Sequence, residues 1–120
     1  MENKYVLIKT DGALVAINSA VDVNAVATLT NKQTTHAVMV GRKSVQRNII
    51  AAIVPQYALE QEGKNVIVQA MNVNLFTTTE NIDDAITKLT DDINKQNYAV
   101  INDMLVARNA YQCAEPIEGN

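Results

Sequence analysis

Residues 66–93, VIVQAMNVNLFTTTENIDDAITKLTDDI, contain the change of pattern on which the fold prediction depends. Up to Phe76 the apolar residues come in short runs and alternations, which are typical of strands. From Thr77 onward they recur every three or four residues, as they do along one face of a helix. A chain with its strands first and its helices last is an α+β protein rather than a series of βαβ units. We therefore predict an antiparallel sheet of about six strands, followed by two C-terminal helices.

The predicted strands follow one another through the first half of the chain. Residues 4–19 are expected to form a hairpin, because Asp11-Gly12 separates two apolar runs. Four more strands are expected at 25–30, 35–40, 47–54 and 64–76, with a turn or bulge at 41–44 and a loop at 56–63. The run from Ile49 to Val54 is apolar throughout, which indicates burial on both faces, and Pro55 ends it.

Two helices are predicted after these strands. Thr77 and Glu80 have the spacing of a capping box, in which each side chain reaches the other residue's backbone N–H. The apolar stripe that follows consists of Ile82, Ile86, Leu89 and Ile93. A second helix is predicted from about Tyr98 to Tyr111. We recognise no internal repeat in the sequence, and we expect one domain, residues 1–120.

Two short helices cannot cover a sheet of this size. Side by side they hide about 20 Å, whereas six strands span about 29 Å. Polar residues such as Asn65, Gln69 and Asn72 alternate with apolar ones, as expected for a face that meets water. The simplest solution is a dimer in which the helices of one chain lie on the sheet of the other. A basic, amide-rich face is then left free.

The sequence offers no recognisable catalytic, metal or cofactor site. His36 is the only histidine and Cys113 the only cysteine, and neither has an evident partner for acid–base or nucleophilic work. The four glycines are isolated, so no phosphate-binding loop is indicated. No apolar stretch approaches the roughly 20 residues of a membrane helix, and the first residues lack a signal-peptide pattern. We predict a cytosolic protein that is not an enzyme and has no membrane partner.

The net charge of −3 conceals an uneven distribution. Between Asn31 and Leu59 the chain carries four basic residues and no acid: Lys32, Arg42, Lys43 and Arg47. Between Glu80 and Asp92 it carries five acids against Lys88 alone. The basic strands are therefore candidates for contact with a polyanion. The alternative explanation is a solvated strand edge that is protected by charge.

The order of these predicted elements resembles that of the coat proteins of the small single-stranded RNA bacteriophages, the levivirus group. The likeness is best in residues 66–93 and in NIIAAIVPQYA (residues 48–58), where an apolar strand ends in Val-Pro before a loop. The opening NKYVLIKTDGALVAI (residues 3–17) is similar to the first hairpin of that family. The resemblance spans nearly the whole chain, but it consists of a pattern rather than an exact motif.

This resemblance implies a structural capsid protein. It would form interlocked homodimers that assemble into an icosahedral virion in the bacterial cytoplasm, packaging the phage RNA and binding an RNA hairpin as a translational repressor. The RNA-binding positions that it implies lie on the middle strands and on the long strand: His36, Arg42, Lys43, Arg47, Gln69, Asn72 and Asn74. The chain departs from the family after Asn48, where it has no polar residue facing RNA. The alternative is a small dimeric α+β binding or inhibitor protein encoded by a phage.

Overall fold

The fold is α+β with antiparallel sheets, as predicted, but its elements alternate along the chain more than the sequence indicated. The protein is seen here in a computed structural model that describes residues 4–117. Within that range there are two α-helices, α1 (Val23–Thr30) and α2 (Ile82–Lys95), and two short 3₁₀ turns, Arg47–Ile49 and Gln56–Leu59. The strands in chain order are β1 (Tyr5–Lys9), β2 (Leu14–Ile17), β3 (Ala37–Val40), β4 (Lys43–Gln46), β5 (Ile50–Pro55), β6 (Val66–Ala70), β7 (Val73–Thr77), β8 (Tyr98–Ile101), β9 (Met104–Ala107) and β10 (Tyr111–Pro116).

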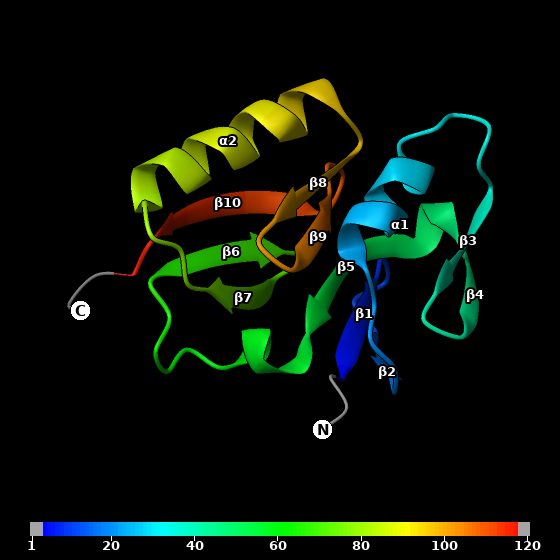
Figure 1. Cartoon of the computed structure of the whole chain (residues 1–120), viewed down its shortest axis with the longest axis horizontal. Helices are drawn as coiled ribbons and strands as arrows, with labels where there is room; N and C mark the ends of the chain where they lie inside the picture. Colours follow the sequence, from blue (N-terminus) through cyan, green and yellow to red (C-terminus); the bar gives the residue numbers. More distant parts are fainter. Residues whose placement is uncertain (1–3, 118–120) are drawn as a thin grey trace.

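These strands form three sheets in place of the single sheet that was predicted. The largest has the order β2-β1-β5-β9-β8, a second has the order β10-β6-β7, and β3 pairs with β4 alone. In Figure 1 the β3–β4 hairpin lies at one end of the molecule and the β10-β6-β7 sheet lies toward the other. The buried side chains of the sheets and both helices join in one hydrophobic cluster.

The central strand β5 is buried along its whole length, which confirms the prediction for this apolar run. It lies between β1 and β9 in the largest sheet, so both of its edges are paired. Pro55 is the last residue of the strand and ends it as predicted, although the strand begins at Ile50 and not at Arg47. The N-terminal hairpin of β1 and β2 is also confirmed.

The segment predicted as a third strand, residues 25–30, belongs to helix α1. The Asp22 side chain caps this helix by accepting hydrogen bonds from the backbone N–H groups of Asn24 and Ala25, each at 3.1 Å. The buried residues recur with helical spacing: Val23, Val26, Ala27 and Thr30. The N-cap and this i, i+3, i+4, i+7 spacing were the overlooked signals.

Residues 64–76, predicted as one long strand, form the hairpin of β6 and β7. Met71 and Asn72 occupy its turn with φ of 51° and 64°, the conformation of a two-residue type I′ turn. Asn tolerates that region better than most residues. The helix after it, α2, is confirmed, but its N-cap is Asn81 and not Thr77, which lies buried in β7.

The second C-terminal helix, predicted at residues 98–111, does not exist in the structure. This segment forms β8 and β9 around an Asn102-Asp103 turn and then begins β10, so the two helices are not both C-terminal. Asn102 has φ of 54°, which suits the tight turn. Helix α2 ends at Lys95, and the backbone of the next residue, Gln96, is extended. No partner chain is present, so the interlocked dimer stays a prediction.

The chain contains the same arrangement of elements twice, which the sequence reading missed. In the first unit, residues 5–55, the order is strand, strand, helix, strand, strand, strand; the second unit, residues 66–116, repeats it. The strands β6, β8, β9 and β10 each begin 61 residues after β1, β3, β4 and β5. In each unit the last strand pairs with the first, and Pro55 opposite Tyr5 corresponds to Pro116 opposite Val66.

Backbone hydrogen bonds repeat at the same interval. The N–H of Arg47 donates to the carbonyl of His36 at 2.8 Å, and the N–H of Arg108 donates to that of Asn97 at 2.8 Å. Likewise the N–H of Gln56 donates to Lys4 at 2.8 Å, and that of Ile117 to Asn65 at 3.0 Å. Few positions have the same residue type in both units, which is why the sequence alone did not reveal the repeat.

Candidate functional site

The residues predicted to bind RNA lie in two separate places. His36, Arg42, Lys43 and Arg47 lie on or beside the β3–β4 hairpin, whereas Gln69, Asn72 and Asn74 lie in the β6–β7 hairpin. These hairpins belong to different sheets and to different units of the repeat. Figure 1 shows β3–β4 and β6–β7 apart, with the large sheet between them. The single RNA-binding face that was predicted is therefore divided.

The basic residues of the β3–β4 hairpin differ in how available they are. Arg42 and Lys43 are exposed at the turn between the strands, and His36 is exposed just before β3. The guanidinium of Arg47 instead donates a hydrogen bond of 2.7 Å to the carbonyl of Lys32 and is only partly exposed. Arg108, its counterpart in the second unit, donates at 2.7 Å to the carbonyl of Ile93. Arg47 thus has the same structural contact as Arg108.

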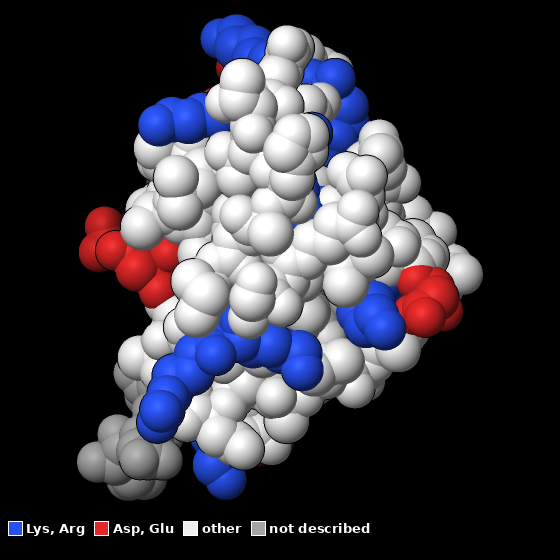
Figure 2. Space-filling model, turned by 90° about the vertical axis from the view of Figure 1, so that its right-hand side faces the viewer, with Lys and Arg blue, Asp and Glu red and all other residues white. Residues whose placement is uncertain are grey.

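The basic side chains on this side of the molecule do not merge into one patch. Figure 2 shows the side that carries the hairpin, with Lys and Arg in separate groups, uncharged surface between them and few acids. A phosphate chain laid along this surface would meet cations at intervals only. Because exposed single charges are well solvated, contacts of this kind depend strongly on salt.

The amide residues Gln69, Asn72 and Asn74 form a hydrogen-bonded cluster with two residues that the prediction missed. Gln69 donates to Asn74 across the hairpin at 2.8 Å. Gln112 of β10 exchanges two hydrogen bonds with Asn72, at 2.7 and 2.9 Å, and the thiol of Cys113 lies 3.1 Å from the Gln69 oxygen. These hydrogen bonds join the side chains to one another, and those of Gln112 hold the β6–β7 turn against β10. Their alternation along the strand was visible in the sequence, but the approach of β10 was not.

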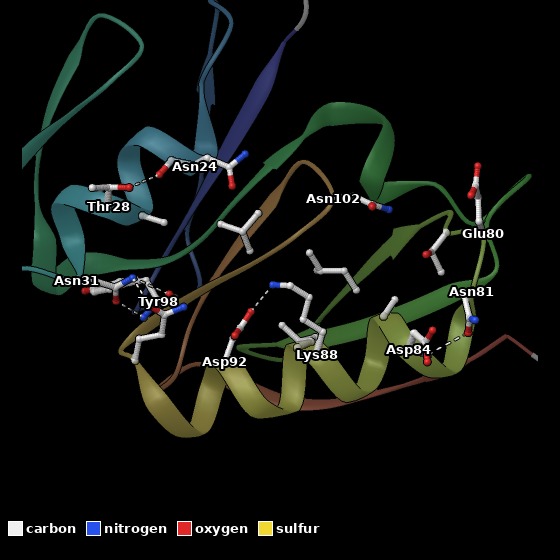
Figure 3. A pocket seen from close by; sticks show the side chains of 17 residues that line it. Asn24, Thr28, Asn31, Glu80, Asn81, Asp84, Lys88, Asp92, Tyr98 and Asn102 are labelled. Carbon is white, nitrogen blue, oxygen red and sulfur yellow. Dashed lines mark hydrogen bonds and ion pairs between the residues drawn. The ribbon is translucent and has the colours of Figure 1, made fainter.

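A groove lies between the two helices. Its volume is about 910 Å³, and its floor is β8, the edge strand of the large sheet. Figure 3 shows α1 on one side, with Asn24, Thr28 and Asn31, and α2 on the other, with Asn81, Asp84, Lys88 and Asp92. The Lys88 side chain extends into the groove and pairs with Asp92 at 2.7 Å.

The Asn31 side chain joins the units at one end of this groove. Its amide donates to the Tyr98 carbonyl at 3.0 Å, and its oxygen accepts from the Tyr98 N–H at 2.8 Å. The Tyr98 hydroxyl in turn donates to the Arg47 carbonyl at 2.9 Å. Burial raises the pKa of Tyr98, while nearby Arg47 acts in the opposite direction. Helix α1 of the first unit is thereby fixed to β8 of the second.

The other end of the β8–β9 hairpin is held by the segment that joins the two units, residues 56–65. The Tyr57 hydroxyl, just after β5, donates a hydrogen bond to the Asp103 carboxylate in the turn. That hydrogen bond, with a smaller effect of burial, raises the pKa of Tyr57 to about 12. Neighbouring Lys64 lies over the Tyr57 ring, 5.4 Å from its centre. The hairpin is therefore anchored by polar contacts at both ends.

The groups that line these surfaces can form hydrogen bonds and ion pairs with a ligand. In residues 4–117 no group of three or more His, Cys, Asp or Glu side chains lies together in a way that could hold a metal ion. The groove presents amides, hydroxyls and the acids Glu80, Asp84 and Asp92 with one lysine, which suits hydrogen bonding to a neutral or cationic segment. Neither α1 nor α2 is long and apolar enough to cross a membrane.

Comparisons with known proteins add no relative. No protein-family model, no curated protein and no solved structure matches the chain.

Proposed function

We propose that this chain is a structural protein that functions by assembling with further copies of itself. The observation that carries this proposal is the number of open strand edges. Each of the three sheets of residues 4–117 has two edge strands that pair with a neighbour on one side only, and β3–β4 forms a sheet of just two strands. Unpaired edges are templates for strand addition, and monomeric proteins usually cover or distort them.

The distribution of charge and apolar side chains favours the same function. One end of the molecule carries the exposed cations Arg42 and Lys43, whereas α2 carries the exposed acids Asp83, Asp84 and Asp91. Two surfaces of opposite sign on one chain attract each other between copies. Met39 adds an exposed apolar side chain, 56% accessible, on the β3 strand. A closed shell around RNA is suggested only by the resemblance to levivirus coat proteins, and two elements that carried that resemblance, the single long strand and the second C-terminal helix, are absent from residues 4–117.

Light scattering coupled to size-exclusion chromatography tests the assembly. We expect the full chain, at physiological salt, to increase in mass with concentration beyond a dimer, and electron microscopy to show ordered particles. A mass that stays at one or two chains up to millimolar concentration would contradict the proposal. A constant dimer would favour the alternative of a small binding or inhibitor protein.

RNA is the second candidate ligand, because Arg42 and Lys43 are exposed on a segment without acids. We expect the double variant Arg42→Ala/Lys43→Ala to lower the 260/280 nm absorbance ratio of purified assemblies. The matched control is Lys4→Ala/Lys95→Ala, which removes two exposed charges elsewhere. Equal ratios in both double variants would exclude the hairpin as an RNA site. Arg47 is left unchanged in this test, since its guanidinium holds the Lys32 carbonyl.

A further inference from the structure

The joint between the two units shows how one unit can hold the next. The β8–β9 hairpin of the second unit adds to the outer edge of β5, the last strand of the first unit, with Ala52 opposite Val106 and Ile53 opposite Leu105. Helix α1 of the first unit packs on β8 and β9. The last strand and the helix of one unit thus form a receptor for the hairpin of the following unit.

The chain contains a second strand and a second hairpin of the kind that form this joint, but the two do not pair with each other. Strand β10 corresponds to β5, and its outer edge has no strand beside it among the described residues. The β3–β4 hairpin corresponds to β8–β9, and it has no receptor strand. The hairpin and β10 do not meet within the chain (Figure 1). They can meet only between copies.

We propose that the β3–β4 hairpin of one chain adds to the outer edge of β10 in a second copy, reproducing the joint between β8–β9 and β5. This inference rests on the proposed function and specifies its interface. The occupant of the β10 edge is thus another copy of the same chain. Since the two surfaces differ, the contact is heterologous, and it generates a filament or a closed ring according to its rotation.

The interval of 61 residues fixes the register of the new pairing. Transferring the internal joint places Val45 opposite Cys113, Ser44 opposite Ala114 and Lys43 opposite Glu115. The ammonium of Lys43 then faces a carboxylate directly across the strands, and both side chains are exposed in the single chain. Opposite charges at directly opposed positions favour antiparallel pairing.

The backbone of β10 is oriented for this addition. The N–H of Ile117 bonds to Asn65, so alternate residues of β10, counting back from Ile117, face β6. Ala114 therefore points its N–H and carbonyl away from β6, toward the open edge. Ser44 lies likewise on the open side of β4, because Val40 and Lys43 close the hairpin turn. The two residues can exchange both of their hydrogen bonds.

The side chains of the β3–β4 hairpin also suit a position beside β10. Val100 of β8 is half-buried in the groove between α1 and α2, whereas its counterpart Met39 is 56% exposed. In the proposed joint α2 of the receiving chain takes the place that α1 has on β8, and it covers Met39. Helix α2 carries an excess of acids and the hairpin carries cations, so the charges of the two surfaces are complementary.

The first test traps the register with a disulfide. In the variant Val45→Cys the new thiol lies opposite the native Cys113 of the next copy, at a pair of positions that do not share hydrogen bonds and are close enough to cross-link. We expect mild oxidation to give a ladder of covalent oligomers, with peptide mapping showing a 45–113 link. The variant Val45→Cys/Cys113→Ser should lose the ladder. Links only between identical positions would overturn the proposed register.

The second test leaves the buried Val45 intact and swaps charges. Lys43→Glu and Glu115→Lys should each raise the dissociation constant of self-association roughly threefold to tenfold, because each creates a like-charged pair. The double variant Lys43→Glu/Glu115→Lys should restore association, and Lys4→Glu should leave it unchanged. A double variant as weak as the single ones would overturn the inference.

A third variant, Ala114→Pro, removes the outward N–H while leaving the hydrogen bonds to β6 in place. We expect it to abolish assembly of a chain that still folds, as circular dichroism would show. The outcomes separate the two proposals. Wild-type chains that never associate would refute both, whereas chains that assemble despite Ala114→Pro and the charge changes would refute this interface and leave the proposed function standing.

Discussion

The hairpins β3–β4 and β8–β9 have the same backbone arrangement, but the first is largely exposed and the second is largely buried. Each has two strands of four residues around a two-residue turn, and each turn begins with a residue of positive φ, Gly41 or Asn102. Yet β9, with the sequence MLVA, is buried at every position, whereas β4, with the sequence KSVQ, buries only Val45. The repeated backbone determines which strand edge a hairpin can pair with. The apolar area that its side chains bury determines how stable that pairing is.

Gly41 shows that even the two turns cannot be exchanged freely. A Cβ atom on Gly41 would lie 2.1 Å from the Ser19 hydroxyl oxygen and 2.9 Å from an Ile17 methyl carbon. Asn102, at the same place in the other hairpin, donates instead to the Thr77 hydroxyl at 2.8 Å. In the first unit the β3–β4 turn therefore packs closely against β2 and the segment after it. In the second unit the β8–β9 turn is held by the hydrogen bond from the Asn102 amide to Thr77.

The largest effect expected from this comparison concerns the apolar strand. Leu105→Ala should lower the free energy of unfolding by about 2–5 kcal/mol, because a fully buried leucine leaves a cavity. The corresponding change in the other hairpin, Ser44→Ala, should shift it by less than about 0.5 kcal/mol, since Ser44 is exposed. Urea unfolding of dilute protein measures both. Similar losses in the two variants would mean that both hairpins are docked in solution.

A smaller effect is expected where helix α1 holds the second unit. Asn31→Ala removes both hydrogen bonds to the backbone of the buried Tyr98 and should cost about 1–3 kcal/mol, because those groups lose their partners. The sequence offers a matched control, since Asn-Lys-Gln occurs at 31–33 and again at 94–96. Asn94 is exposed, so Asn94→Ala should be nearly neutral in dilute protein. Equal effects would show that Asn31 has no special role at the junction.

The smallest effect concerns pH. Hydrogen bonding to Asp103 raises the pKa of Tyr57 to about 12, above the usual value near 10. Its contribution to stability is therefore fully present below pH of about 10 and is lost as the pH rises through about 12. Absorbance at 295 nm should show that Tyr57→Phe removes a titration near pH 12 and that Asp103→Ala moves it toward 10. A Tyr57 that titrates normally in the unaltered chain would contradict this contact.

Two parts of the first unit, the β1–β2 hairpin and the strand β5, were predictable because their signals are local. The β1–β2 hairpin follows from Asp11-Gly12, and the buried β5 follows from an unbroken apolar run. The second unit was harder, because its turns use Met71-Asn72 and Asn102-Asp103, which are weaker signals than Asn-Gly or Asp-Gly. The spacing of apolar residues in 98–111 matches that of a helix by coincidence, but the segment pairs as strands with β5 and with itself. Missing these turns concealed the repeat.

The candidate site was predictable in composition but not in arrangement. The sequence identified exposed cations at Arg42 and Lys43 and the amide alternation of Gln69, Asn72 and Asn74. It could not show that Arg47 caps a carbonyl or that the amides pair with β10, because those partners lie 15 to 44 residues away. It also placed on one face two groups that the structure separates. Only the folded chain decides which strands become neighbours.

The sequence by itself determined the fold class, the buried central strand, the amphipathic α2 and the separation of basic from acidic segments, since each depends on neighbours within a few residues along the chain. The tertiary structure alone decided that the chain is a repeat of 51-residue units, with one joint closed and its counterpart open. The physical reason is that strand pairing is a contact between distant segments. Its partners are selected by the whole fold, and a local pattern records only that a strand exists.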